Sequence, residues 1–230
     1  MTRLILFDID GTLLNSGGSG SRSLRESVTA VTGRACPPPG DWAGKTDRAI
    51  VESLLRTLGV AVTNERIAAV KAAYLARLPE NLAHNSRKQL IPGAREFLRQ
   101  LAAYPGMRMG LQTGNFKQGA DIKLRCFGLL GYFDCGGFGD STCSRTELVR
   151  QAIANCEAHC GQRFAHGITL IGDTPADIQA GRNVGALTIA ITSGFCSRAD
   201  LQSARPGIMA KDFTELLNRV DCIVGTKSAS

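Results

Sequence analysis

The hydrophobic positions of this chain fall into two kinds of segment. Short apolar runs, typical of strands buried on both faces of a parallel sheet, are separated by stretches in which apolar residues recur at helical spacing. The strand-like runs lie at 4–7, 107–113, within 132–138, at 167–171 and at 186–191. Because strand and helix alternate, we expect an α/β fold with a Rossmann-like parallel sheet and right-handed crossovers.

One stretch interrupts this alternation directly after the first strand. Between residues 15 and 88 no strand pattern occurs, and apolar residues follow helical spacing instead. Three helices are expected, over 24–31, 50–58 and 67–78. Pro79 is expected to end the third. We therefore predict a core domain of residues 1–14 and 89–230 and an inserted all-helical cap domain of residues 15–88.

Composition and charge narrow the function classes. The chain has 230 residues, of which 43% are hydrophobic, and a net charge of +7. This charge suits anionic ligands, phosphate esters included. Because the basic residues are scattered without an interleaved aromatic series, we expect no nucleic-acid partner. No apolar run approaches the length of a membrane span, and the N-terminus lacks a signal-peptide pattern, so we expect no membrane association and a cytoplasmic location.

The cysteines add no metal site to this picture. The eight are Cys36, Cys126, Cys135, Cys143, Cys156, Cys160, Cys196 and Cys222. Cys156 and Cys160 share a helix face, but no second pair of cysteines or histidines completes a zinc set. We expect reduced, free thiols, as in cytoplasmic proteins of this size.

The first strand ends in a pair of carboxylates. Asp8 and Asp10 follow the apolar run at the carboxyl end of that strand, and Gly11 and Thr12 come next. Like charges this close raise each other's pKa unless a cation or hydrogen-bond donors compensate. Ligands of open α/β sheets bind at the carboxyl ends of the strands. The pair therefore indicates a cleft that holds a divalent metal, and Mg²⁺ favours such oxygen ligands.

Two further strands also end in polar residues. Thr113, Gly114 and Asn115 follow the second core strand, where they form either a turn or an anion-binding loop. Asp173 and Asp177 follow the fourth.

The second acidic pair has a structural alternative. Thr174 and Pro175 are typical of the first turn of a helix, which an acidic residue caps. Capping does not require two acids one helical turn apart, where they repel each other. With Asp8 and Asp10 already present at another strand end, we favour metal binding for Asp173 and Asp177.

Asp-x-Asp-Gly-Thr after an apolar strand resembles the signature of the haloacid dehalogenase superfamily. The resemblance spans the core and implies that Asp8 is a nucleophile that forms an aspartyl-phosphate. It implies that Asp10 is the general acid and base and contacts Mg²⁺ through its backbone carbonyl. It further implies that Asp8 and Asp173 bind the metal directly, with Asp177 either a direct or an indirect ligand.

The remaining site residues agree less closely with the pattern of the family. Thr113 corresponds to the family's Ser/Thr that binds a phosphoryl oxygen, with Gly114 and Asn115 beside it. The family places a Lys before the helix that precedes the fourth strand, yet Lys is absent from 124–210. Arg145 is the best replacement, since Arg also neutralises phosphate.

Arg150 is the second choice for that position. Lys45, in a Gly-Lys-Thr-Asp stretch of the cap, is either a substrate contact or a solvated charge, and Thr46 or Asp47 there either lines the pocket or caps a helix.

The sequence thus predicts a Mg²⁺-dependent phosphatase for a small phosphorylated metabolite, most similar to phosphoglycolate-phosphatase-like members with a small helical cap. A phosphomutase of the β-phosphoglucomutase type has the same core motifs and stays an alternative. A non-catalytic phosphate-ester-binding protein is a second one. Asp10 argues against a dehalogenase, and a monomer or homodimer is expected.

Overall fold

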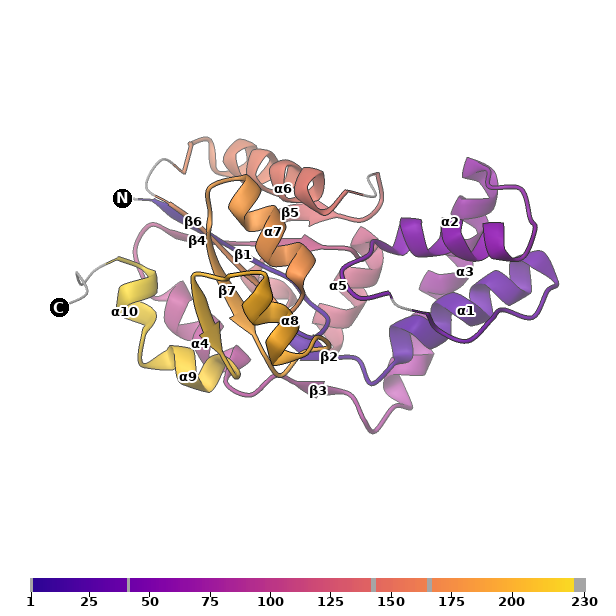
Figure 1. The fold of residues 1–230 in the computed structure, drawn as a ribbon, viewed down its shortest axis with the longest axis horizontal. Coiled ribbons are helices and arrows are strands. Elements are labelled where there is room, and N and C mark those ends of the chain that lie inside the picture. The colour runs from indigo at the N-terminus through magenta and orange to yellow at the C-terminus, as the bar shows by residue number, and fades with distance from the viewer. Residues whose placement is uncertain (1, 41, 142–143, 165–166, 226–230) are drawn as a thin grey trace.

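A single parallel sheet forms the centre of the molecule (Figure 1). The computed structural model describes residues 2–40, 42–141, 144–164 and 167–225. The strands of the sheet are β1 (Arg3–Phe7), β4 (Met107–Thr113), β5 (Cys135–Phe138), β6 (Ile168–Gly172), β7 (Leu187–Ile191) and β8 (Ile208–Ala210). Their order is β5-β4-β1-β6-β7-β8, and every pairing is parallel, so the expected α/β fold is confirmed.

Helices cover both faces of the sheet because β1 presents apolar side chains to both. Ile5 and Phe7 pack against one set of helices, and Leu4 and Leu6 against the other. The first set is α4 (Ala94–Ala102), α5 (Lys117–Cys126), α9 (Phe213–Leu217) and α10 (Val220–Ile223). The second is α6 (Arg145–Cys160), α7 (Pro175–Asn183) and α8 (Arg198–Ser203). A short 3-10 helix spans Leu130–Tyr132.

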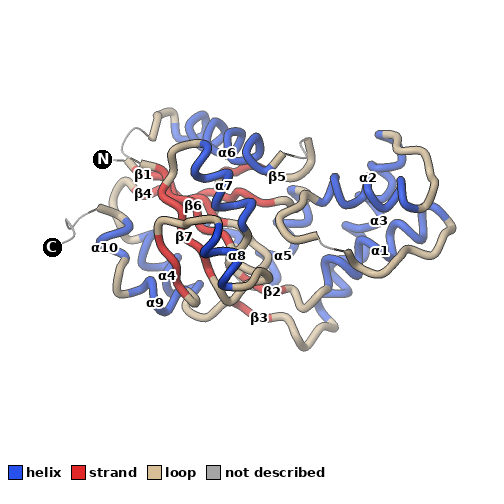
Figure 2. The backbone as a smooth tube through the Cα atoms, in the orientation of Figure 1, coloured by secondary structure: helices blue, strands red, loops and turns tan. Residues whose placement is uncertain are grey.

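Three helices lie to one side of the sheet, where Figure 2 shows them as a separate group. They are α1 (Ser19–Thr32), α2 (Asp47–Thr57) and α3 (Asn64–Ala83). They share an apolar cluster of their own, to which α5 adds Phe116 from its N-terminal end. Two short antiparallel strands, β2 (Leu14–Asn15) and β3 (Gln89–Leu90), lie where the chain leaves and re-enters the core. We propose that residues 15–88 form the cap domain expected from the sequence.

The third helix does not end at Pro79. Helix α3 continues to Ala83 with Pro79 inside it, so that expectation was wrong. Proline removes one backbone hydrogen bond of a helix, which normally ends or kinks it. Tertiary contacts beyond the proline offset this loss. Leu82 is buried in the apolar cluster of the three helices, and the Asn81 amide donates to Ser23 and Glu26 of α1.

The sequence pattern did not predict three short elements near the C-terminus. They are α8, β8 and α10, none longer than six residues. Elements this short have too few residues for a helical or strand period to be distinguished. Within the described residues, no helix is both long and apolar enough to cross a membrane.

Two of the cysteines are paired, contrary to the expectation of free thiols. Cys135 of β5 and Cys156 of α6 form a disulfide. Gly110 of β4 makes room for it, because a Cβ there would lie 2.7 Å from the Cys156 sulfur. Cys36, Cys126, Cys160 and Cys222 are free. Cys143 lies outside the described residues.

Replacing Cys135 with serine is expected to lower the stability of the oxidised protein. The bridge closes a loop of 21 residues, which corresponds to about 3 kcal/mol in the chain-entropy view of disulfides. Thermal melts of Cys135→Ser and of the exposed free thiol variant Cys126→Ser check this. Equal melting temperatures for the two variants, both unchanged by reductant, would contradict the structural role of the bridge.

Candidate active site

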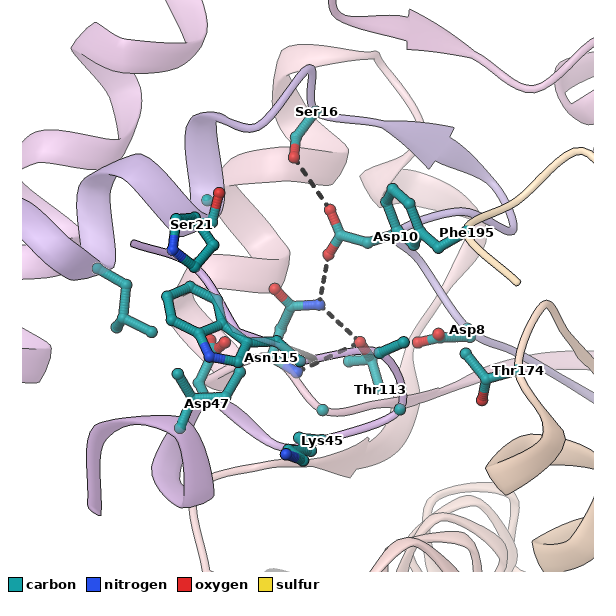
Figure 3. Close-up of a pocket in the computed structure, with 18 of the residues that line it drawn as sticks. Asp8, Asp10, Ser16, Ser21, Lys45, Asp47, Thr113, Asn115, Thr174 and Phe195 are labelled. Carbon is teal, nitrogen blue, oxygen red and sulfur yellow. Dashed lines mark hydrogen bonds between the residues drawn. The ribbon is translucent and has the colours of Figure 1, made fainter. Parts of the chain in front are cut away.

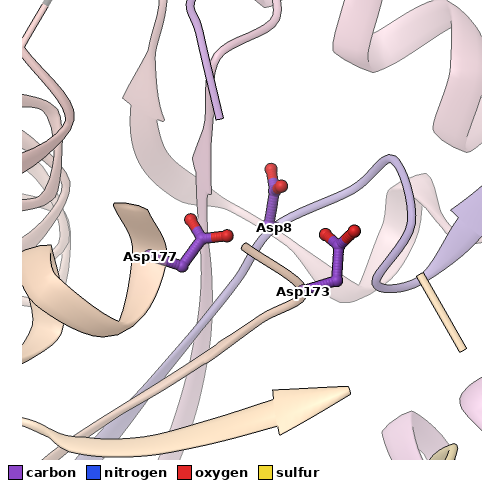
Figure 4. A group of neighbouring side chains, drawn as sticks. All are labelled: Asp8, Asp173 and Asp177. Carbon is purple, nitrogen blue, oxygen red and sulfur yellow. The ribbon is translucent and has the colours of Figure 1, made fainter. Parts of the chain in front are cut away.

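Three buried carboxylates meet at the carboxyl end of the sheet (Figure 4). Asp8 follows β1, Asp173 follows β6, and Asp177 lies in the first turn of α7. One oxygen from each lies within 4.8 Å of the others. Neighbouring parallel strands bring their carboxyl ends to one edge, and this places residues far apart in the chain side by side.

Two glycines permit the close packing around Asp173. Gly11 has a φ of +81°, and a Cβ at Gly11 or at Gly194 would collide with the Asp173 carboxylate. The Thr12 hydroxyl donates to Asp173 at 3.0 Å, and the backbone N–H of Phe195 donates to its other oxygen at 2.9 Å. The loops after β1 and β7 therefore hold the Asp173 carboxylate in one orientation, facing Asp8.

The charges in this cluster are not balanced by the protein alone. Burial, and to a smaller degree Asp177 and Asp10, raise the pKa of Asp8 to about 6, although Arg145 works in the other direction. Burial together with the charges of Asp8 and Asp177 raises the pKa of Asp173 well above its usual value. A divalent cation between these carboxylates would favour their ionised forms. The donor set, oxygens only, fits a hard cation.

Asp177 has fewer oxygen lone pairs available for a metal than the other two. Its Oδ2 accepts from the N–H and the hydroxyl of Thr174, in a capping box at the start of α7. Its Oδ1 accepts from Arg145 and from the Gln112 amide at 3.1 Å. Capping and metal binding were alternatives in the sequence, and the contacts add a third role. Asp177 orients Arg145.

Arg145 links the nucleophile candidate to Asp177. It is buried at the N-terminus of α6, and its Nη2 lies 3.1 Å from the Asp8 carboxylate and 2.5 Å from that of Asp177. Burial alone would lower its pKa, but the charges of Asp177 and Asp8 raise it instead. Arg150, the second choice, is exposed and pairs with Glu147. Arg145 is therefore the cation that stands beside Asp8.

Asp10 points away from the acid cluster, toward the three-helix group. Its carboxylate accepts from Ser16 at 3.2 Å, from the Asn115 amide at 2.9 Å and from the Lys123 ammonium at 2.5 Å (Figure 3 shows the first two). Burial would raise the pKa of Asp10, but Lys123 and the hydrogen bonds from Asn115 and Ser16 together outweigh it and hold the pKa below its usual value. Asp10 is thus ionised and hydrogen-bonded, with its side chain outside the metal-binding group.

The loop after β4 lines one cavity together with Asp8 and Asp10. Thr113 accepts a hydrogen bond from the Asn115 amide at 2.7 Å, which leaves its hydroxyl proton free to be donated to a ligand (Figure 3). Gly114 packs against the cap segment, since a Cβ there would lie 2.4 Å from the Lys45 carbonyl oxygen. Its own carbonyl accepts from the Asp47 N–H at 2.7 Å. This glycine therefore joins the loop after β4 to residues 44–47.

A cavity of about 390 Å³ lies between the strand ends and the three helices. Asp8, Asp10, Thr113, Asn115 and Arg145 line its inner end. Its outer walls include Lys45, whose side chain is exposed. Such a volume is typical of sites for small ligands. Most of the residues singled out in the sequence thus share one cavity. The exceptions are Thr46, Arg150, Asp173 and Asp177, of which the two acids lie behind Asp8.

Two polar residues of the site, Lys123 and Gln112, were not predicted from the sequence. Lys123 lies in the middle of α5, and it is buried against Asp10 and Asn115. The only signal for it is its position among buried Ala120 and Leu124, where a lysine needs a charged partner. Gln112 lies inside β4, where a polar side chain is unusual, and its Oε1 has no hydrogen-bond partner within the described residues.

An acid cluster at the strand ends of an α/β core, beside a cavity that a group of three helices also lines, defines the class of this protein. Residues 2–185 match the family model of the haloacid dehalogenase-like hydrolases. The chain belongs to that family, and it is an enzyme that resembles the phosphatases within it.

Curated relatives and a solved structure cover almost the whole chain. The phosphoglycolate phosphatase of Synechococcus elongatus is 27% identical over 94% of this chain and 96% of its own. The probable phosphatase IndB of Dickeya dadantii is 23% identical over 100% and 98%. A hydrolase from Pseudomonas syringae superposes with a TM-score of 0.71 at 24% identity, over 97% and 99%. The last similarity supports the fold alone.

Proposed function

We propose that this protein is a Mg²⁺-dependent phosphatase that hydrolyses a small phosphate monoester through an aspartyl-phosphate on Asp8, and phosphoglycolate, the ester suggested by the sequence, is one candidate. The observation that carries the proposal is the position of Asp8. Its carboxylate lies at the inner end of the cavity, with Asp173 on one side and Arg145 on the other. A carboxylate between a metal site and a guanidinium is placed to attack a phosphoryl group.

In the first step, an Asp8 carboxylate oxygen bonds to phosphorus and the bond from phosphorus to the ester oxygen breaks. The leaving alcohol takes a proton from Asp10. Although Lys123 holds Asp10 ionised in the free protein, the negative charges of the incoming ester raise the affinity of Asp10 for a proton. Arg145 and the Thr113 hydroxyl neutralise and orient the phosphoryl oxygens.

In the second step, Asp10 removes a proton from water, whose oxygen bonds to phosphorus. The bond between phosphorus and the Asp8 oxygen breaks, which releases inorganic phosphate and restores the carboxylate. Asp8, Asp173 and the Asp10 carbonyl, with Asp177 behind them, would hold Mg²⁺, which would supply positive charge to offset the negative charge of the phosphoryl group. Residues 15–88 cover the cavity and exclude bulk water while this happens.

Release of inorganic phosphate from a panel of small esters, phosphoglycolate included, tests the proposal. We expect release in Mg²⁺ and none after chelation with EDTA. Release that persists after chelation would contradict the metal requirement. Transfer of phosphate between two positions of one sugar, without release, would favour the mutase alternative instead. Binding of esters without any turnover would favour a binding protein.

Mg²⁺ is expected to stabilise the protein more at about pH 7.5 than at about pH 5. The pKa of Asp8 is about 6 in the folded chain and 3.8 in the reference state, so the folded state keeps its proton longer. Without metal, stability therefore falls as pH rises through this interval. Above it, the ionised carboxylates bind the cation, whereas protons compete below it.

The expected rise in melting temperature at neutral pH is about 5–10 °C at a hundred times the dissociation constant. Melts in MgCl₂ and in NaCl of equal ionic strength measure it. Asp173→Asn serves as the control that removes one ligand. An equal shift at both pH values, or the same shift in Asp173→Asn, would contradict metal binding by this cluster.

A further inference from the structure

The outer half of the cavity is lined by apolar side chains from both parts of the molecule. Phe195, in the loop after β7, is 56% exposed although it is large and hydrophobic. Trp42, Leu24 and Ile50 line the cavity from the three-helix group. An aromatic ring from the core and another from the cap segment therefore border the space beyond the phosphoryl site. Large exposed aromatic side chains at a cavity are typical of ligand contact.

Asp47, a carboxylate without a salt bridge among the described residues, lies in the same wall. Asp47, at the start of α2, accepts the Phe116 N–H through Oδ2 at 2.9 Å. Within the described residues its Oδ1 accepts no hydrogen bond, and the residue lines the cavity. Burial raises the pKa of Asp47 to about 6, with the charge of Lys123 lowering it only in part. Ionised Asp47 would gain from a donor that a ligand brings.

The cations of the cavity are engaged elsewhere. Lys123 is bonded to Asp10 and Asn115, and Arg145 to Asp8 and Asp177. Both are thus committed to the phosphoryl end. Lys45 is exposed, so water and salt screen its charge. A second anionic group on the substrate, such as the carboxylate of phosphoglycolate, would meet Asp47 with no uncommitted buried cation among the described residues to offset it. The cavity therefore favours a different ester from the phosphoglycolate-like one that the sequence suggests.

We propose that the substrate is a phosphate monoester of an aromatic alcohol that carries an amine or another hydrogen-bond donor, recognised by Asp47 and by the rings of Trp42 and Phe195. The proposal rests on the proposed function for the position of the phosphate. The organic group extends from the Thr113 and Asn115 loop toward α2. Figure 3 shows Asp47 and Asp8 on opposite sides of these two residues, as this orientation requires.

Binding measurements separate this proposal from the question of turnover. Asp8→Asn, loaded with Mg²⁺, provides a background in which bound esters are not consumed. Two probes of matched shape are 4-(aminomethyl)phenyl phosphate and 4-carboxyphenyl phosphate. We expect the amine to bind about ten-fold more tightly by calorimetry, as a partly buried ion pair allows. Asp47→Asn, whose amide oxygen still accepts the Phe116 N–H, is expected to bring the ratio within about three-fold.

The contact of the substrate with the rings of Trp42 and Phe195 is tested by comparing the affinities for phenyl phosphate and methyl phosphate. Trp42→Ala is expected to reduce the preference for the phenyl ester about five- to ten-fold, as loss of ring contacts implies. Asp121→Asn, which removes a half-buried carboxylate paired with Lys117 on α5 and outside the cavity lining, is the matched control and should leave both ratios unchanged.

Tighter binding of the carboxyl ester, or a ratio that Asp47→Asn does not change, would overturn the proposal. Loss of carboxyl-ester binding in Lys45→Ala alone would assign the outer cavity to an anion instead. If the amine preference holds while the native protein releases no phosphate from any ester, the proposed function fails and the recognition by Asp47 stands.

Discussion

Asp8→Asn is expected to reduce phosphate release from every ester by more than about 10⁴-fold, a loss comparable with removal of other nucleophiles. The amide of asparagine has no carboxylate oxygen to attack phosphorus. The residue lies at the inner end of the cavity between Asp173 and Arg145, so no neighbouring carboxylate occupies the same position. Assays of native and variant protein at equal concentration, with Mg²⁺, measure the effect.

Loss of activity in Asp8→Asn is expected without loss of the fold. Because burial raises the pKa of Asp8, its ionised form is unfavourable in the metal-free protein at neutral pH. The metal-free variant should therefore melt at the same or a higher temperature than the native protein at about pH 7.5. Activity that survives in a folded variant would remove Asp8 from the mechanism. Loss of activity in a variant that has also unfolded would say nothing about the role of Asp8. A thermal melt therefore accompanies every assay.

Arg145→Met is expected to reduce kcat/KM by about 10³-fold and to destabilise the protein by about 3–5 kcal/mol. The first loss follows from removal of a preorganised cation at the phosphoryl group. The second follows because the buried Asp177 would lose its charged partner, with Asp8 beside it. Steady-state kinetics and urea unfolding measure the two effects independently.

Two further variants separate charge from position at this site. Arg145→Lys keeps a cation but loses the two-nitrogen contact with Asp177, so it should keep more activity than Arg145→Met. Arg150→Met is the matched control from the same helix, since Arg150 is exposed and pairs only with Glu147 among the described residues. If Arg150→Met lost as much activity as Arg145→Met, the phosphoryl-binding role of Arg145 would be contradicted.

The pattern of the sequence was sufficient for five of the six strands of the parallel sheet and for the position of the acids. The apolar run before Asp8 and the run before Asp173 both predicted buried parallel strands, and these strands are neighbours in the structure. Residues at the ends of such strands meet at one edge whatever the details of side-chain packing. For this reason Asp8, Asp173 and Asp177 could be grouped from the chain alone, and the placement of Arg145 at the start of its helix followed from the same regularity.

The hydrogen-bond and disulfide partners in the structure could not be predicted from the sequence in the same way. Lys123 reaches Asp10 across 113 residues of chain, because α5 turns one particular face toward the three-helix group. The disulfide of Cys135 and Cys156 depends on the register of β5 against β4 and on the space that Gly110 leaves. Nothing in the local spacing of charged residues or cysteines encodes such contacts.

The sequence by itself therefore determined the α/β core, the helices that follow the first strand and the strand ends that carry the acids, because hydrophobic periodicity and turn residues act over a few neighbouring positions. Only the tertiary structure decided that helix α3 continues through Pro79, that Asp177 holds Arg145 and that Lys123 holds Asp10. The same is true of the Asp47 oxygen that accepts no hydrogen bond from the described residues. These outcomes depend on how elements distant in the chain pack, and on which buried charge finds a partner.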